Sequence, residues 1–227
     1  MYMLSMFILV ISISCVLFGS LSVKGQTEDQ LVYPPHSEPF GISYGDWTAK
    51  WWQWALSIPG NESLISDKTG QFCTIGQDDP NVFFLAGSGG GAVERACSIP
   101  TGVGVLIPVL NAEYSYAEFP NLKTEAELRS AVHADMDGAR SMRLFVDGVE
   151  IKDLSRFRVD SPIFNFSTPQ GGLFGLDNVN SQGVSDGYYV MLKELHPGSH
   201  EVRWSGIVFF ADGTNQPEDT TYHLTVK

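Results

Sequence analysis

The feature that most constrains the fold is a series of short segments in which apolar and polar residues alternate, separated by turns rich in glycine and proline. Alternation with a period of two is typical of a β-strand that buries one face. About nine such segments are expected to form strands or hairpins, at residues 82–86, 92–99, 103–110, 143–151, 156–159, 163–167, 188–195, 200–211 and 220–226. They predict a mainly β fold with minor α+β character, which we interpret as an antiparallel β-sandwich of Greek-key or jelly-roll type.

The turns between these segments differ in how clearly they specify a hairpin. Asp147 and Gly148 form an Asp-Gly pair, which accepts the positive φ angles of a type I′ turn and predicts a hairpin within residues 143–151. The run GSGGG at residues 87–91 is expected to join the first two strands as a hairpin. A phosphate-binding loop is not favoured there, because no Lys-Ser/Thr pair and no predicted helix follow the glycines.

One short segment, residues 46–58, carries four tryptophans. We expect a helix there that Asp46 caps and that Pro59 and Gly60 end. Its large apolar side chains recur at helical spacing and form one stripe, which predicts packing in the core: Trp47, Trp51, Trp54 and Ile58. Trp52 lies off this stripe, so we expect it to be exposed and consider it a candidate for stacking on a sugar ring.

A second helix is expected from Thr124 to about residue 140, between two groups of strands. Thr124 and Glu127 match a capping box. The apolar side chains of this segment fall on one helix face, which is expected to be buried: Leu128, Val132 and Met136.

The N-terminal residues have the composition of an export signal. Residues 1–23 contain no charged side chain, and most of them are apolar. We expect residues 1–25 to be a signal peptide that is cleaved before Gln26, giving a secreted, periplasmic or cell-surface protein. The alternative is an uncleaved membrane anchor at residues 4–23, because the segment lacks a basic residue before its apolar run and is nearly long enough to cross a bilayer.

The rest of the chain is expected to form one domain at residues 46–227, preceded by an extended lead-in at residues 26–45 that lies over the domain or tethers it. Apart from Cys15 in the predicted signal, the chain has two cysteines, Cys73 and Cys97. A lone pair of cysteines in an exported protein usually forms a disulfide, and we expect one here.

Charge and motifs limit the classes of partner. The formal net charge of −12 and the scattered Lys and Arg residues exclude a typical nucleic-acid-binding surface. No zinc, redox or nucleotide motif is present, so we expect no cofactor. Contact with a membrane is expected only through an uncleaved N-terminal segment.

Candidate functional residues fall into two groups. The long segment 169–186 is expected to be strandless and to form a binding rim, whose polar side chains include Asn178, Asn180 and Gln182. The alternative is a metal or acid–base site in which Glu113, His200 and His223 converge near predicted strand ends. From strand parity, His200 is expected to point inward and His223 outward, and His133 is expected to pair with Asp137 one helix turn away.

A set of motifs spread over residues 44–226 carries a resemblance: YGDWTAKWWQWALSIP, FCTIGQ with VFFLAG, ACSIPTG with LIPVLN, and DGYYVMLKELHPGSHEVRWSG with TYHLTV. Together they are similar to a group of exported bacterial and archaeal proteins of uncharacterised function. The resemblance implies that the paired cysteines and a C-terminal β-hairpin containing DGYY and PGxH are features of the group. It implies no activity and supplies no catalytic residue.

The sequence therefore favours a non-catalytic exported module that binds a carbohydrate, an envelope component or a protein partner. An extracytoplasmic hydrolase or metal-dependent enzyme using Glu113, His200 and His223 is the first alternative. A purely structural envelope protein is the second.

Overall fold

The structure is a computed structural model that describes residues 26–227. The predicted signal peptide or anchor lies outside the described residues. Among residues 26–227, no helix is long and apolar enough to cross a membrane.

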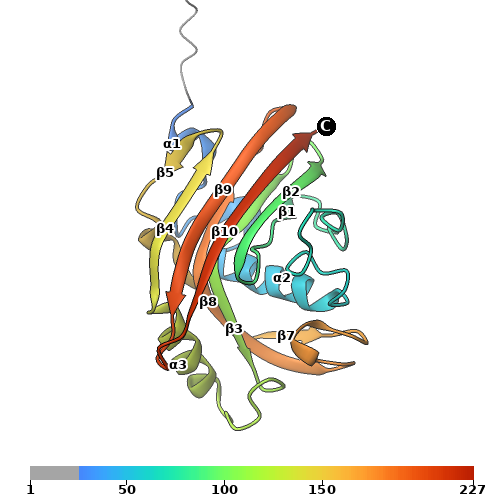
Figure 1. Cartoon of the computed structure of the whole chain (residues 1–227), viewed down its shortest axis with the longest axis vertical. Coiled ribbons are helices and arrows are strands. Elements are labelled where there is room, and N and C mark those ends of the chain that lie inside the picture. Colours follow the sequence, from blue (N-terminus) through green and yellow to red (C-terminus); the bar gives the residue numbers. More distant parts are fainter. Residues whose placement is uncertain (1–25) are drawn as a thin grey trace, which may run out of the picture.

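Two five-stranded sheets form the body of the molecule (Figure 1). The first sheet has the order β1-β3-β8-β6, with β7 also paired to β8: β1 (Val82–Phe84), β3 (Gly104–Ser115), β8 (Asn180–Leu192), β6 (Arg158–Asp160) and β7 (Phe164–Ser167). The second has the order β2-β10-β9-β4-β5: β2 (Gly91–Ile99), β10 (Asn215–Val226), β9 (Gly198–Phe209), β4 (Ala139–Val146) and β5 (Val149–Ile151). The mainly β class is confirmed. Both sheets are mixed, however, because β1 pairs with β3 and β2 with β10 in parallel.

The connections between strands correct two expectations about hairpins. Residues 87–91 do not join a hairpin, because β1 and β2 belong to different sheets. The segments that contain DGYY and PGxH do not form the expected C-terminal hairpin either, since their strands, β8 and β9, lie in different sheets. The Asp-Gly hairpin is confirmed: β4 pairs with β5 in antiparallel, and Asp147 and Gly148 have φ angles of 50° and 78°. Alternation predicts which face a strand buries, but it does not decide which sheet the strand joins.

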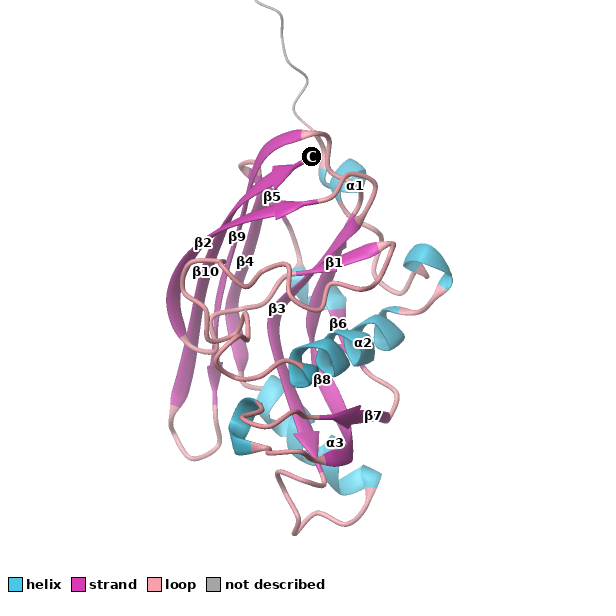
Figure 2. Cartoon of the chain, turned by 90° about the vertical axis from the view of Figure 1, so that its right-hand side faces the viewer, coloured by secondary structure: helices cyan, strands magenta, loops and turns pink. Residues whose placement is uncertain are grey.

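The Trp-rich helix α2 (Tyr44–Ser57) packs against β7 and β8 of the first sheet (Figure 2). Its N-cap is Ser43, whose side chain accepts a hydrogen bond from the Asp46 backbone, so the predicted cap was three residues too late. Trp52 is only 5% exposed, and its predicted exposure was wrong. The reason is that α2 is enclosed on more than one side, so leaving the main stripe does not bring a side chain to solvent.

The interior of the second sheet is built around Trp204, Tyr222 and Arg95, all fully buried. The rings of Trp204 and Tyr222 stack with their centroids 5.6 Å apart. The Arg95 guanidinium donates to the backbone carbonyls of Asp67, Ala86 and Gly87 and to the Tyr222 hydroxyl. These bonds offset the free-energy cost of burying the Arg95 charge. They also connect Arg95, after the GSGGG loop, to residues that precede the loop.

Helix α3 (Glu125–Met136) has the predicted capping box of Thr124 and Glu127. Cys73 and Cys97 form a disulfide, with their Cα atoms 6.1 Å apart, that ties a long loop to β2. The lead-in lies over the domain: α1 (Glu28–Leu31) precedes Val32, which forms a β-bridge with Leu192. Three short 3-10 turns complete the described elements: η1 (Pro39–Gly41), η2 (Leu154–Phe157) and η3 (Leu173–Gly175).

Candidate ligand-binding cavity

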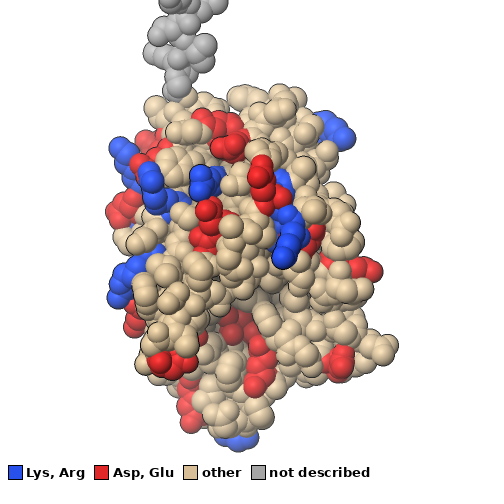
Figure 3. Space-filling view, viewed as in Figure 1, with Lys and Arg blue, Asp and Glu red and all other residues tan. Residues whose placement is uncertain are grey.

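The cavity of interest borders the C-terminal half of β3. Strand β1 pairs only with residues 104–106 of β3, so within residues 26–227 the rest of that edge carries no partner strand. A cavity of about 380 Å³ lies there, between β3, α2, η3, α3 and the end of the β9–β10 hairpin. Figure 3, drawn from the viewpoint of Figure 1, shows a hollow in the lower half of the molecule with acidic side chains inside it. The volume is at the lower end of the range for small-molecule sites.

Glu113 is the most unusual residue of this cavity. It lies on β3 opposite Ser185 of β8, and it is 7% exposed. Its carboxyl group lies over Gly183, where a Cβ atom would be 2.4 Å from Oε1. Neither carboxyl oxygen has a hydrogen-bond partner among residues 26–227. A buried polar side chain without a partner is rare in folded proteins and requires a specific explanation.

Burial raises the pKa of Glu113 well above the ordinary range, and the neighbouring Glu118 raises it further. Glu118 follows β3 and accepts a hydrogen bond of 2.7 Å from the Ser115 hydroxyl. Two ionised carboxylates side by side repel each other, so the pair is more stable when one of them keeps a proton. We assign this proton to Glu113, because it is the more deeply buried of the two.

The other charged groups of the cavity wall are also acidic. Asp135 of α3 accepts a hydrogen bond of 2.8 Å from the Tyr114 hydroxyl. Glu218 of β10 accepts one of 2.8 Å from the Ser88 backbone. Within the described part of the chain, no Lys or Arg lines the cavity. A low-dielectric hollow with charge of one sign attracts cations and repels anions.

Aromatic side chains supply much of the remaining wall. Trp52 lines the cavity, and its indole Nε1 donates to the Tyr189 hydroxyl at 3.0 Å. Asn111 of β3 donates to the same hydroxyl at 2.9 Å. These bonds fix the indole ring and the amide in place beside the carboxyl groups. The cavity therefore combines rigid aromatic faces with polar groups, as small-ligand sites do.

Phe174 in η3 stands at the rim. It is 56% exposed, and its ring centroid is 6.4 Å from that of Trp52. Its φ angle of 58° lies in the left-handed region, which a bulky side chain rarely adopts. Gly171 holds the rim loop to the turn after α2, because its carbonyl accepts a 2.7 Å hydrogen bond from the Gly60 backbone N–H. An exposed aromatic ring in a strained conformation at a cavity is typical of a functional position.

The predicted rim residues are only partly placed at this cavity. Trp52 lines it, and so does Phe174 from the predicted rim segment. Asn178, Asn180 and Gln182 are exposed and are not part of the lining. Asn180 accepts from Ser167, and Gln182 donates to the Asn165 side chain. Residues 180–186 belong to β8, so the segment is shorter than expected and only its first part is a loop.

The structure does not bring Glu113, His200 and His223 together. His200 bonds to Asp147 at 2.6 Å and to the His196 carbonyl at 2.7 Å, at the β4–β5 turn. His223 is exposed on β10 and bonds to Glu94 of β2 at 2.7 Å, and neither histidine lines the cavity of Glu113. The Glu113–His200–His223 arrangement is therefore not formed in the folded chain.

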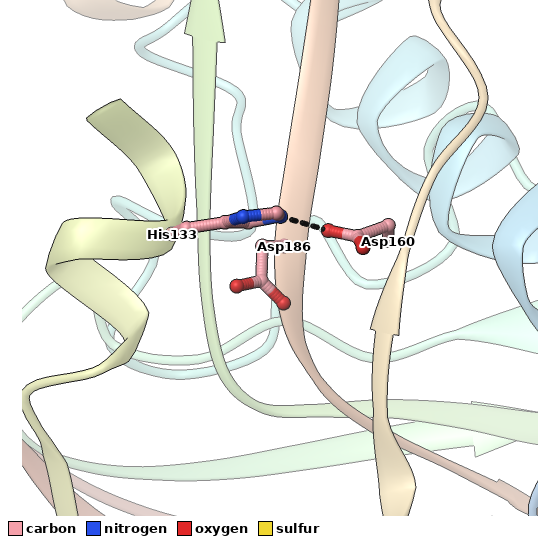
Figure 4. Close-up of side chains that lie close together, drawn as sticks. All are labelled: His133, Asp160 and Asp186. Atoms are coloured by element: carbon pink, nitrogen blue, oxygen red, sulfur yellow. Dashed lines mark hydrogen bonds and ion pairs between the residues drawn. The ribbon is translucent and has the colours of Figure 1, made fainter. Parts of the chain in front are cut away.

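A different trio has the atoms of a metal site. In the described residues, ligand atoms of His133, Asp160 and Asp186 lie within 4.8 Å of one another (Figure 4). His133 bonds to Asp160 at 2.6 Å, and not to Asp137 as the helical spacing predicted.

Arg158 already supplies a positive charge to this trio. It contacts Asp186 through two nitrogens, the shorter distance being 2.6 Å, and Asp137 at 2.7 Å. Burial raises the pKa of Asp186, and Arg158 opposes that effect. The trio is therefore explained as an ion-pair network that joins α3, β6 and β8, as buried carboxylates usually require.

Sequence reasoning missed Asp135, Glu218 and Phe174 as members of one site. A signal existed only for Phe174, which is an aromatic residue between glycines in a predicted loop. Neither a scan against models of known protein families nor a search of curated proteins finds a match to this chain. The function must therefore be argued from the cavity itself.

Proposed function

We propose that this protein is a non-catalytic, extracytoplasmic binding protein whose cavity beside β3 takes a small carbohydrate. The observation that carries the proposal is Glu113, a buried carboxyl group that lines a cavity and has no partner within residues 26–227. Such a group is costly in the free protein, and a ligand that hydrogen-bonds to it recovers that cost.

The walls support a carbohydrate over other small molecules. Sugar rings present hydroxyl groups to carboxyl and amide side chains, and their C–H faces pack on aromatic rings. Glu113, Glu118 and Asn111 offer the polar groups, and Trp52 and Phe174 offer the aromatic faces. An anionic ligand is disfavoured by the acidic wall. The disulfide supports an oxidising compartment, which agrees with export.

The test is a glycan array followed by titration of tryptophan fluorescence, because Trp51 and Trp52 line the cavity. Phe174→Ala is expected to weaken binding about tenfold, the loss of one exposed stacking contact. Phe209→Ala is the matched control, since Phe209 is 50% exposed and is not part of the lining. Binding that is unchanged in Phe174→Ala and in Glu113→Gln would contradict this placement of the site.

One observation favours a second candidate, an acid–base hydrolase. Glu113 holds a proton beside Glu118, and paired carboxyl groups of unequal pKa are used by glycoside hydrolases. This version does not use His200 or His223. Release of reducing sugar from an oligosaccharide that binds, abolished in both Glu113→Gln and Glu118→Gln, would support hydrolysis over binding alone.

A further inference from the structure

We infer that the ligand of this cavity is an amino sugar with a free ammonium group, whose binding displaces a proton from the Glu113 carboxyl. The inference rests on the proposed carbohydrate function and specifies its ligand class. It uses the charges of the cavity wall, the unpaired state of Glu113 and the position of the aromatic rings.

The charge of the cavity wall favours a cationic ligand. Four carboxyl groups line the cavity, and they come from β3, the segment after it, α3 and β10: Glu113, Glu118, Asp135 and Glu218. No basic side chain of residues 26–227 is among the lining residues to compensate them. A neutral sugar would leave this negative potential in place, whereas an ammonium group would lower it.

These carboxyl groups are not equally available to a ligand. Asp135 is bonded to the Tyr114 hydroxyl, Glu218 to Ser88, and Glu118 to Ser115. Glu113 alone among them has neither oxygen bonded to a donor of residues 26–227. An ammonium group has three donors and no acceptor, so it matches an ionised Glu113 with Glu118 beside it.

A cationic ligand also changes the protonation of Glu113. Burial and the charge of Glu118 keep Glu113 protonated in the free protein. The remaining titratable groups of the wall are Asp135, Tyr114 and Glu218, and no histidine is among the described lining residues. When an ammonium group enters, the carboxylate form of Glu113 becomes the favoured one, and the carboxyl proton passes to solvent. The bound state then contains an ion pair in place of a carboxylic acid.

The shape of the wall suits a sugar ring. Trp52 and Phe174 are adjacent rings, and Trp52 is held by its bond to Tyr189. A sugar ring that packs on these faces lies in the same cavity as the β3 side chains Asn111 and Glu113. Gly183 allows the Glu113 carboxyl group to lie against the β8 backbone, since a Cβ atom there would be 2.4 Å from Oε1.

The experiment compares three disaccharides of the same β-1,4-linked size with the purified protein: the glucosamine dimer, its N-acetylated counterpart and cellobiose. At about pH 6, calorimetry is expected to give at least tenfold tighter binding of the glucosamine dimer than of the two neutral sugars. Tighter or equal binding of a neutral sugar would overturn the amino-sugar inference and leave the proposed carbohydrate function standing. Binding of none of the three would overturn both.

Proton displacement is tested in phosphate and in ACES buffers, which differ in their enthalpy of ionisation. The enthalpy of binding is expected to differ between the two buffers for the unmodified protein, because a proton is released into the buffer. Equal enthalpies would overturn the displacement.

Glu113→Gln keeps the size of the side chain and removes the titrating group. It is expected to abolish the buffer difference and to weaken binding of the glucosamine dimer about ten- to a hundredfold, with cellobiose much less affected. Glu118→Gln provides a second variant if Glu113→Gln does not fold. Glu94→Gln, an exposed carboxylate on β2 that pairs with His223, is the matched control and is expected to change neither quantity.

Discussion

Replacing Glu113 by glutamine should change how the free energy of unfolding depends on pH. The folded protein holds a proton on Glu113 that the unfolded chain releases above the ordinary glutamate pKa of 4.5. Unfolding then releases a proton, so the contribution of Glu113 to stability is complete below the unfolded pKa and is lost as pH rises toward the folded pKa. In this window the loss is about 1.4 kcal/mol for each pH unit.

The glutamine of the Glu113→Gln variant cannot ionise, so the variant does not lose stability in this way as pH rises. Its free energy of unfolding, compared with that of the unmodified protein, is expected to rise by about 1.4 kcal/mol per pH unit between roughly pH 5 and the folded pKa of Glu113. Above that pKa the difference should become constant. The burial of Glu113, only 7% exposed and unpaired within residues 26–227, is the reason that solvent does not screen the effect.

The assay is denaturant unfolding of both proteins at half-unit steps from about pH 4 to pH 8, followed by tryptophan fluorescence. Comparing the two proteins at each pH cancels the titration of groups remote from the site. Glu94→Gln serves as the control, because its side chain is exposed. If the curves of Glu113→Gln and the unmodified protein run parallel over this range, Glu113 is ionised in the folded state, which contradicts the prediction.

Three further predictions concern stability and the rim. Replacing Cys73 and Cys97 together by serine should lower the free energy of unfolding by about 3 kcal/mol, since the disulfide spans 24 residues, and denaturation of the oxidised and variant proteins checks this. Burial alone would lower the pKa of His200, but its bonds to Asp147 and to the His196 carbonyl raise it above the ordinary value. Protonated His200 therefore stabilises the folded protein below about pH 6.5, and this stabilisation is lost as pH rises through the folded pKa. His200→Gln should therefore destabilise the protein more in mildly acidic than in alkaline buffer, and an equal effect at both would contradict the assignment. Phe174→Asn should raise the free energy of unfolding by about 0.5–1 kcal/mol, because asparagine tolerates the left-handed conformation. The same variant should bind the ligand more weakly. A lower free energy of unfolding would contradict strain at this position.

The proposed site lies where a strand edge of the β-sandwich is left unpaired by the described residues. Strand β1 stops pairing at residue 106 of β3, and the open edge beyond it becomes the wall of a cavity. Pro108, which has no backbone N–H, lies just beyond the part of β3 that pairs with β1. It is next to a register shift at residues 108–110 in the pairing of β3 with β8. Proline and bulges are common where an edge must not pair with another strand. The same edge is then free to present Asn111 and Glu113 to a ligand.

Local sequence determined those parts of the protein that depend on neighbours along the chain. The capping box of Thr124 and Glu127, the Asp147–Gly148 hairpin and most strand positions follow from interactions within a few residues. The disulfide followed from having two cysteines outside the predicted signal. These features are set by backbone geometry, hydrogen bonding and periodicity, which a short segment carries with it.

Tertiary structure alone decided the sheet to which each strand belongs and the composition of the site. β2 pairs with β10, which is distant in sequence, and not with its neighbour β1, which lies in the other sheet. The alternation of apolar and polar residues does not distinguish between these partners, because it is the same for each of them. For the same reason Trp52 became buried, His200 and His223 were placed away from Glu113, and four carboxyl groups from separate elements came to line one cavity. The pKa of a carboxyl group depends on its burial and on nearby charges, and neither exists until the chain has folded.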